Sequence, residues 1–459
     1  MTPECRTSAF PAEIDDAIFE WVAAYQSWSP MRRAAITRRT KLSMATLCSC
    51  ALTCRAWLPT SRACLYRRLV LRGSDRTSLE RLVRSFETNP WLRTLISELD
   101  IVEDTELAPN PSGPPRRILN LKRADDISHT WALILAGKLP SLHTLGVAFP
   151  DGLARHPQFV RSMRTFGAVT TLTLEWKSSG TFTDLFRLIA AFPNLRTVIL
   201  HGTMWAPKGT RPVIPSHRFP PLSRLTIMNG WFSKDTVSTD VTYTFLQVVA
   251  DSVKILYLDA PGSIPPLQDL PDGQMTLAHP VMPRLHTLHV HIVRSLGLEL
   301  DFDQFERFVN WVSRSAPALK RLVFHLLPFH RQDRIWSTDL ESILGRLEWT
   351  YDQLRVHPQL STTNYILLLC HDTPQSLKHH TMLVIEAAVC VRETISRFEQ
   401  PPNIKVIWGV LTESLERVYL TVMEPEDRVM RSSYLPPPEL AIGQDKPVAM
   451  LIADVEQET

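Results

Sequence analysis

The sequence predicts an α/β protein in which a small, all-α N-terminal segment precedes a long series of strand–helix repeats. Three observations lead to this prediction. Residues 10–71 place apolar residues at helical spacing. Beyond them, a short pattern written L-x-x-L-x-L, with Val, Ile or Phe allowed, recurs along the chain. Between the copies of this pattern the apolar period becomes helical again.

The composition sets the class of protein. A chain of 459 residues exceeds one ordinary hydrophobic core, which indicates several domains or a repeat array. The hydrophobic fraction of 44% is typical of globular proteins, and a net charge of +3 is too small to favour nucleic-acid binding over the whole surface. The start of the chain shows no secretory pattern, and no apolar run approaches the roughly 20 residues that span a bilayer. We therefore expect a cytoplasmic and/or nuclear protein that binds neither nucleic acid nor membrane.

The first helix is predicted within FPAEIDDAIFEWVAAY. Its residues Ile14, Ile18 and Val22 recur at i, i+4 and i+8, and Pro11 suits a helix start. A basic insert over residues 27–41 follows, with arginines and a lysine but no acidic residue. This insert is either a solvated loop or a contact for nuclear import or an acidic surface.

Two further helices are predicted within TLCSCALTCRAWLPTSRACLYRRLVL. Leu47, Ala51, Cys54 and Leu58 have helical spacing, and Pro59 then interrupts the helix. The residues after Pro59 predict a short helix with the apolar positions Leu65, Tyr66 and Leu69.

The repeated pattern predicts the strands of the second part. Copies begin at Leu142, Val169, Leu195, Leu222, Val253, Leu285 and Leu319, with looser copies at Ile96 and Leu415. The intervals between the seven clear copies are 27, 26, 27, 31, 32 and 34 residues, and most copies follow a lead-in that contains proline. A strand followed by a helix at this period is the signature of a leucine-rich-repeat solenoid, with parallel strands on the concave face and helices on the convex face. The Asn or Cys usual after the third apolar position is mostly absent, so we expect irregular repeats.

The intervening segments predict helices. Leu79, Leu82, Val83 and Phe86 fall on one face of SLERLVRSF, and FDQFERFVNWV behaves in the same way. The expected domains are a helical domain at 8–72, repeats over 73–425 with a divergent part at 327–400, and a Pro-rich then acidic tail at 426–459.

Four cysteines, Cys48, Cys50, Cys54 and Cys64, raise the question of a metal or redox site. Their C-x-C-x3-C-x9-C spacing differs from zinc pairs, and the nearest histidine in sequence is His129. No C-x-x-C pair and no nearby general base are present either. We therefore expect free thiols and no metal. Cys50, Cys54 and Trp57 instead form an i, i+4, i+7 face that fills a core or meets a partner.

These residues resemble a known family. The N-terminal region resembles the F-box, most closely the F-box proteins numerous in mushroom-forming fungi, and the CALTCRAW run is its most specific part. The matching positions are Phe10–Ile14, Ile18–Phe19, Ala51–Trp57 and Leu65–Tyr66. The basic insert departs from the family pattern. An F-box followed by degenerate leucine-rich repeats accounts for most of the chain.

The resemblance implies a non-catalytic substrate receptor of an SCF-type ubiquitin ligase. The F-box would bind the Skp-type adaptor, and through it a cullin, while the repeats hold a target protein. By match to the family, the adaptor-binding residues would be Pro11, Ile14, Ile18, Leu52, Cys54 and Trp57. The alternative is an F-box scaffold that acts outside a ligase. No enzyme motif is present, so we expect neither an enzyme nor a cofactor.

The expected target surface is the outward row of the repeat strands. Alternate strand positions would line the concave face, either as a target-binding surface or as merely solvated positions. The candidates are Glu175, Ile199, His201, Met228, Tyr257, Asp259, His289, His291 and His325. The three histidines could bind a metal or make target binding pH-dependent if they cluster, although exposed strand histidines are commoner.

Overall fold

The computed structural model describes residue 19 and residues 44–53, 55–72, 76–102, 130–149, 157–176, 182–201, 219–228, 245–259, 280–292, 302–326, 360, 364–371, 404–411 and 418–422. Contacts within the chain divide it into two compact units, residues 1–241 and residues 242–459. Each unit is described by itself below.

The first unit begins with helices and then becomes a parallel sheet. Residues 44–53 are helical, a turn at residues 55–57 follows, and α3 spans Leu58–Arg67. Pro59 lies in the first turn of α3, where a missing N–H costs nothing. The chain passes directly from α3 into β1 (Arg68–Arg72), and then into α4 (Arg76–Thr88) and α5 (Leu92–Leu95).

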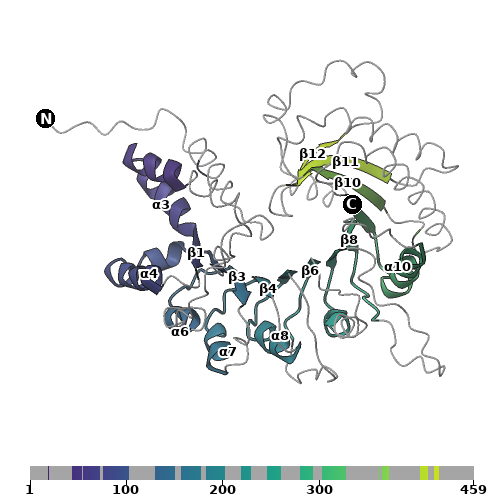
Figure 1. Ribbon diagram of the computed structural model, residues 1–459, viewed down its shortest axis with the longest axis horizontal. Helices are drawn as coiled ribbons and strands as arrows, with labels where there is room; N and C mark the ends of the chain where they lie inside the picture. The colour runs from purple at the N-terminus through teal and green to yellow at the C-terminus, as the bar shows by residue number, and fades with distance from the viewer. Residues whose placement is uncertain are drawn as a thin grey trace, which may run out of the picture. The chain divides into compact units, whose positions relative to one another are not determined.

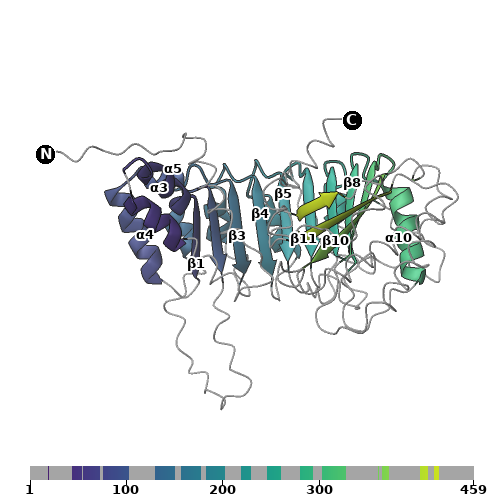
Figure 2. The ribbon, with the colours of Figure 1, turned by 90° about the horizontal axis from the view of Figure 1, so that it is seen from above.

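The sheet of the first unit is made of β1 to β6 in chain order, each strand parallel to the one before. Its remaining strands are β2 (Glu98–Val102), β3 (Thr144–Phe149), β4 (Thr171–Trp176), β5 (Thr197–His201) and β6 (Arg224–Met228). Strands β2 to β6 each begin two residues after the first apolar residue of a pattern copy. Figure 2 shows these strands side by side. The α/β class predicted from the sequence is therefore confirmed.

Helices connect these strands. α6 (Trp131–Leu135), α7 (Pro157–Met163) and α8 (Phe182–Ile189) precede β3, β4 and β5, and they lie on one side of the strands (Figure 1). Parallel strands require such crossovers, because a tight turn can join only antiparallel neighbours.

The core of the first unit is built from the repeated apolar positions. All three apolar positions of each clear copy in this unit are buried, as in Leu142, Leu145 and Val147 of the first. The helices complete this layer with aromatic rings. Trp131 of α6 is 0% exposed and meets Phe159 of α7 edge to face, with ring centroids 6.0 Å apart. Each strand–helix unit therefore buries its apolar face mainly against its neighbours.

One kind of turn leads into β3, β4 and β5. The first apolar residue of a copy donates its N–H to the carbonyl three residues earlier, as Leu142 does to Leu139 (3.3 Å) and Leu195 to Phe192 (3.3 Å). Pro140 and Pro193 follow those acceptors, at the turn position for which proline is preorganised. Pro140 and Pro193 thus favour the turns through which the chain enters β3 and β5.

The second unit contains β7 to β12. Its elements are β7 (Ile255–Asp259), β8 (Thr287–Ile292), α10 (Phe302–Ser315), β9 (Arg321–Leu326), β10 (Asn364–His371), β11 (Ile404–Leu411) and β12 (Val418–Val422), and residues 245–249 are helical. Neighbouring strands from β7 to β11 are parallel, and β12 pairs antiparallel with β11. On α10, Phe308, Val309 and Val312 are buried, as the helical spacing predicts.

Two sequence predictions need correction. Leu69, expected on a short helix, lies in β1, because Tyr66–Leu71 (YRRLVL) is itself a copy of the strand pattern. The copy at Leu415 does form a strand, β12, but this strand is antiparallel. From the divergent part 327–400 the structure describes Leu360 and β10, and the tail 426–459 lies outside the described residues. Among the helices in the described ranges, none is long and apolar enough to cross a membrane.

Candidate interaction surfaces

The N-terminal helical segment has a packed side that includes the tryptophan of the CALTCRAW run. Leu47 is 0% exposed, and the ring of Trp57 meets Phe19, which is 2% exposed, edge to face at 5.7 Å. The carbonyl of Trp57 accepts hydrogen bonds from both the N–H and the hydroxyl of Ser61. Trp57 therefore joins the first two predicted helical stretches and caps the start of α3.

Another face of helix 44–53 carries exposed apolar side chains. Met44 is 44% exposed, Leu52 is 88% exposed, and Cys48 between them is also exposed. These three residues stand at i, i+4 and i+8, so they share one face of the helix. We call Met44, Cys48 and Leu52 the apolar stripe. A leucine exposed to this degree on an ordered helix is available to a partner.

The predicted adaptor-binding residues thus differ in their surroundings. Leu52 lies on the apolar stripe, whereas Trp57 is half-buried against Phe19. Pro11, Ile14, Ile18 and Cys54 lie outside the described residues. The sequence prediction did not group Met44 and Cys48 with Leu52 on one face, although their spacing from Leu52 was a usable signal. Cys48, Cys50 and Cys64 form no disulfide.

The predicted target-binding residues are brought into two rows by the strand register. In the first unit, Ile199 pairs with Thr173 and Thr226, and His201 pairs with Glu175 and Met228. In the second unit, His289 pairs with Tyr257 and Val323, and His291 pairs with Asp259 and His325. Adjacent strands lie about 4.8 Å apart, so each row places its residues next to one another.

Within the second unit this row is packed rather than solvated where its side chains are described. The rings of Tyr257 and His289 stack with centroids 3.9 Å apart and an interplanar angle of 10°. Tyr257 is 7%, His289 6% and Val323 3% exposed. These positions are therefore not simply solvated strand positions, and Tyr257 and His289 offer a target little surface. Ile199 in the first unit is half-buried.

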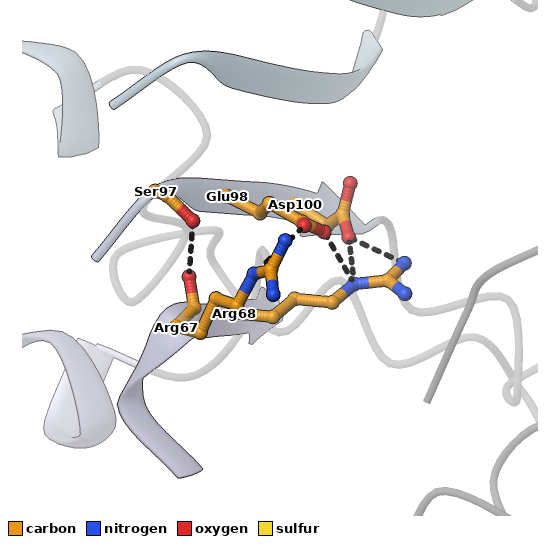
Figure 3. Close-up of polar contacts among 5 residues, drawn as sticks. All are labelled: Arg67, Arg68, Ser97, Glu98 and Asp100. Carbon is orange, nitrogen blue, oxygen red and sulfur yellow. Dashed lines mark hydrogen bonds and ion pairs between the residues drawn. The ribbon is translucent and has the colours of Figure 1, made fainter. Parts of the chain in front are cut away.

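In the first unit, the strand face that carries the row of predicted target-binding residues also holds a charged cluster, on β1 and β2 (Figure 3). The Arg68 guanidinium meets Asp100 Oδ2 through Nε at 2.9 Å and through its terminal nitrogen at 2.8 Å. Their side chains are 12% and 9% exposed. Glu98 lies 3.7 Å from Arg67 Nε and 3.9 Å from Arg68 Nε. The cluster ties the first strand to the second at the point where the helical segment ends.

This cluster was not predicted, because β1 was read as a helix. Once Arg68 is placed at the start of a strand, the register brings Val70 opposite Asp100 and Arg68 opposite Glu98. Both acids then lie within reach of the long arginine side chain.

Compared with models of known protein families and with curated proteins, the chain matches none.

Proposed function

We propose that this protein is a non-catalytic substrate receptor of an SCF-type ubiquitin ligase. Its N-terminal helices are an F-box that binds a Skp-type adaptor, and its irregular leucine-rich repeats hold a target protein. Such a receptor acts by proximity: it raises the effective concentration of target lysines near the activated ubiquitin.

The apolar stripe is the observation on which the proposal chiefly rests. It lies on the helix that carries the first half of the CALTCRAW run, and Leu52 belongs to that run. A helix that exposes Met44, Cys48 and Leu52 on one face, while burying Leu47 on another, has the apolar anchors of a helix that docks onto a partner.

The strand–helix array supplies the second half of the proposal. Copies of the same six-residue pattern give consecutive parallel strands in both units, in the same register from copy to copy. Such stacking is the physical principle of a leucine-rich-repeat domain, which presents a long surface to a protein partner.

The test replaces the apolar stripe without touching the core. We expect Leu52→Asp to abolish binding of the purified chain to a Skp-type adaptor in a pull-down. The reason is that burying a carboxylate in an apolar contact is costly. The matched control is Leu133→Asp on α6, where another leucine is 46% exposed. Adaptor binding that survives Leu52→Asp with the fold intact would show that this helix is not the docking element.

A second measurement separates the ligase receptor from an adaptor-bound scaffold. Affinity purification from cells should recover both the adaptor and a cullin with the wild-type chain, and neither with Leu52→Asp. Recovery of the adaptor without a cullin would favour the scaffold function.

A further inference from the structure

The amino-terminal edge of the parallel strands carries an excess of positive charge. Its residues are the two that follow the first apolar residue of each copy, which stand just before the strand and at its start. From β1 to β9 these positions hold Arg67, Arg68, His143, Arg196, Arg224, Lys254, His286, Lys320 and Arg321, together with Ser97, Glu98, Thr144, Thr170, Thr171, Thr197, Ser223, Ile255 and Thr287. Glu98 is the single acid among them, whereas the whole chain is balanced at 50 Lys and Arg against 47 Asp and Glu.

The backbone holds these residues in line. The Lys254 carbonyl accepts the N–H groups of His286 (3.0 Å) and Thr287 (3.2 Å), and the His286 carbonyl accepts those of Lys320 (2.9 Å) and Arg321 (3.0 Å). Lys254, His286 and Lys320 therefore succeed one another across β7, β8 and β9, at the strand spacing of about 4.8 Å. We call Lys254, His286, Lys320 and Arg321 the basic ledge.

The side chains of the basic ledge face solvent to different degrees. Lys254 and Lys320 are exposed, and His286 and Arg321 are half-buried. Within the described part of the chain, neither lysine lies within 4.0 Å of a carboxylate. The acid nearest in sequence, Asp251, is exposed in the turn after helix 245–249. Lys254 and Lys320 therefore keep positive charges that other described residues do not neutralise.

We propose that the basic ledge binds an acidic, extended segment of a partner protein. The observations favour a peptide over nucleic acid in two respects. The exposed Lys254 and Lys320 stand at equivalent positions before β7 and β9, on one line across the strand starts, which suits a linear chain better than the broad phosphate array of a duplex. The whole-chain net charge of +3 also gives little of the long-range attraction that nucleic-acid binders use. The segment supplies carboxylates, and Lys254 and Lys320 supply exposed ammonium groups at close range.

Binding of an acidic segment follows from the charge of the ledge alone. That this segment belongs to a target of the ligase rests on the proposed function. Binding of an acidic peptide requires no adaptor. A failed adaptor experiment therefore leaves this proposal standing, and a failed peptide experiment leaves the proposed receptor standing.

The experiment measures fluorescence anisotropy of a labelled peptide of alternating glutamate and serine, titrated with the full chain at low ionic strength. We expect saturable binding that weakens as salt is added, because surface charges are screened. Lys254→Glu with Lys320→Glu should weaken binding about tenfold, since two close attractions become repulsions. Both residues are exposed and precede their strands, so the fold should persist, which far-ultraviolet circular dichroism checks.

The matched control is Arg81→Glu with Arg84→Glu, two exposed cations on α4. Both double variants change the formal net charge from +3 to −1, so they differ only in where the charge is lost. We expect the control to weaken binding less than about twofold. The milder variant Lys254→Gln with Lys320→Gln should give an intermediate loss.

Three outcomes would overturn the proposal. Equal weakening in the ledge and control variants would show that net charge alone attracts the peptide. Absence of saturable binding by the wild-type chain would remove the site. Tighter binding of a labelled DNA duplex than of the peptide, lost in the ledge variant, would assign the ledge to nucleic acid instead.

Discussion

Asp100 is the residue on which the start of the sheet depends most visibly. Its carboxylate holds the Arg68 guanidinium, and both side chains are nearly excluded from solvent. Removing one member of a buried pair leaves the other without a counter-charge, and this is far costlier than losing an exposed pair.

We expect Asp100→Ala to destabilise the protein by about 2 kcal/mol, less than the 3–5 kcal/mol typical of a broken buried pair, because Glu98 remains near Arg68. The measurement is the midpoint of urea denaturation, with Glu80→Ala on α4 as the control. Arg76 and Glu80 form an exposed pair at 3.0 Å, and its loss should cost less than about 0.5 kcal/mol. Equal effects of the two changes would contradict a structural role for the Arg68–Asp100 pair.

Gly146 is coupled to the same carboxylate. A Cβ at this position would stand 2.1 Å from Asp100 Oδ1, so alanine would force Asp100 away from Arg68. Gly146→Ala should therefore destabilise the first unit by about 1–3 kcal/mol. Gly167→Ala is the matched control, since nothing lies within 4 Å of its added Cβ, and it should be neutral or slightly stabilising. Thermal melting of both variants checks the prediction, and a neutral Gly146→Ala would refute it.

At the scale of the element, helix 44–53 has a packed side and an exposed side. Leu47 is fully buried and Leu52 is 88% exposed, although both are leucines five residues apart in one helix. The two faces can therefore be changed independently.

Truncating each leucine should show this separation. Leu47→Ala should cost about 2–4 kcal/mol, because it removes buried methyl groups and leaves a cavity. Leu52→Ala should stay within about 0.5 kcal/mol of wild type, because surface substitutions seldom do more. The measurement is the denaturation midpoint of each variant, and a large loss in Leu52→Ala would place that side chain in a core instead.

The elements differ in how well the sequence predicts them. Strands β2 to β9 follow from the repeated pattern, because its apolar positions recur at orderly intervals and a proline precedes most copies. β1 was missed because YRRLVL begins with tyrosine and follows a helix, so the same letters also satisfied a helical period. The antiparallel direction of β12 depends on chain connections that a six-residue pattern does not encode. The stacked Tyr257 and His289 depend on register between strands, which the sequence of one strand does not reveal.

At the scale of the molecule, the repeats determine how a local change spreads. Each strand of the first unit pairs only with its sequence neighbours, so its stability depends on them most strongly. Leu172→Ala, in the core position of β4, should lower amide hydrogen-exchange protection most in β3, β4 and β5 and least in β1. Mass spectrometry of exchanged peptides measures this pattern. A uniform loss from β1 to β6 would mean that the first unit opens as a single cooperative block.

The direct junction between α3 and β1 has a mechanical consequence. Arg67 ends the helix and Arg68 begins the strand, with no linker between them, and the Arg67 carbonyl is bonded to the N–H of Ser97 at 2.9 Å. A hinge needs residues that can absorb a change of backbone angle, and none stands here. A rotation of α3 would therefore also rotate β1 and the strand paired to it, because the backbone at the junction has no residue that can absorb the change.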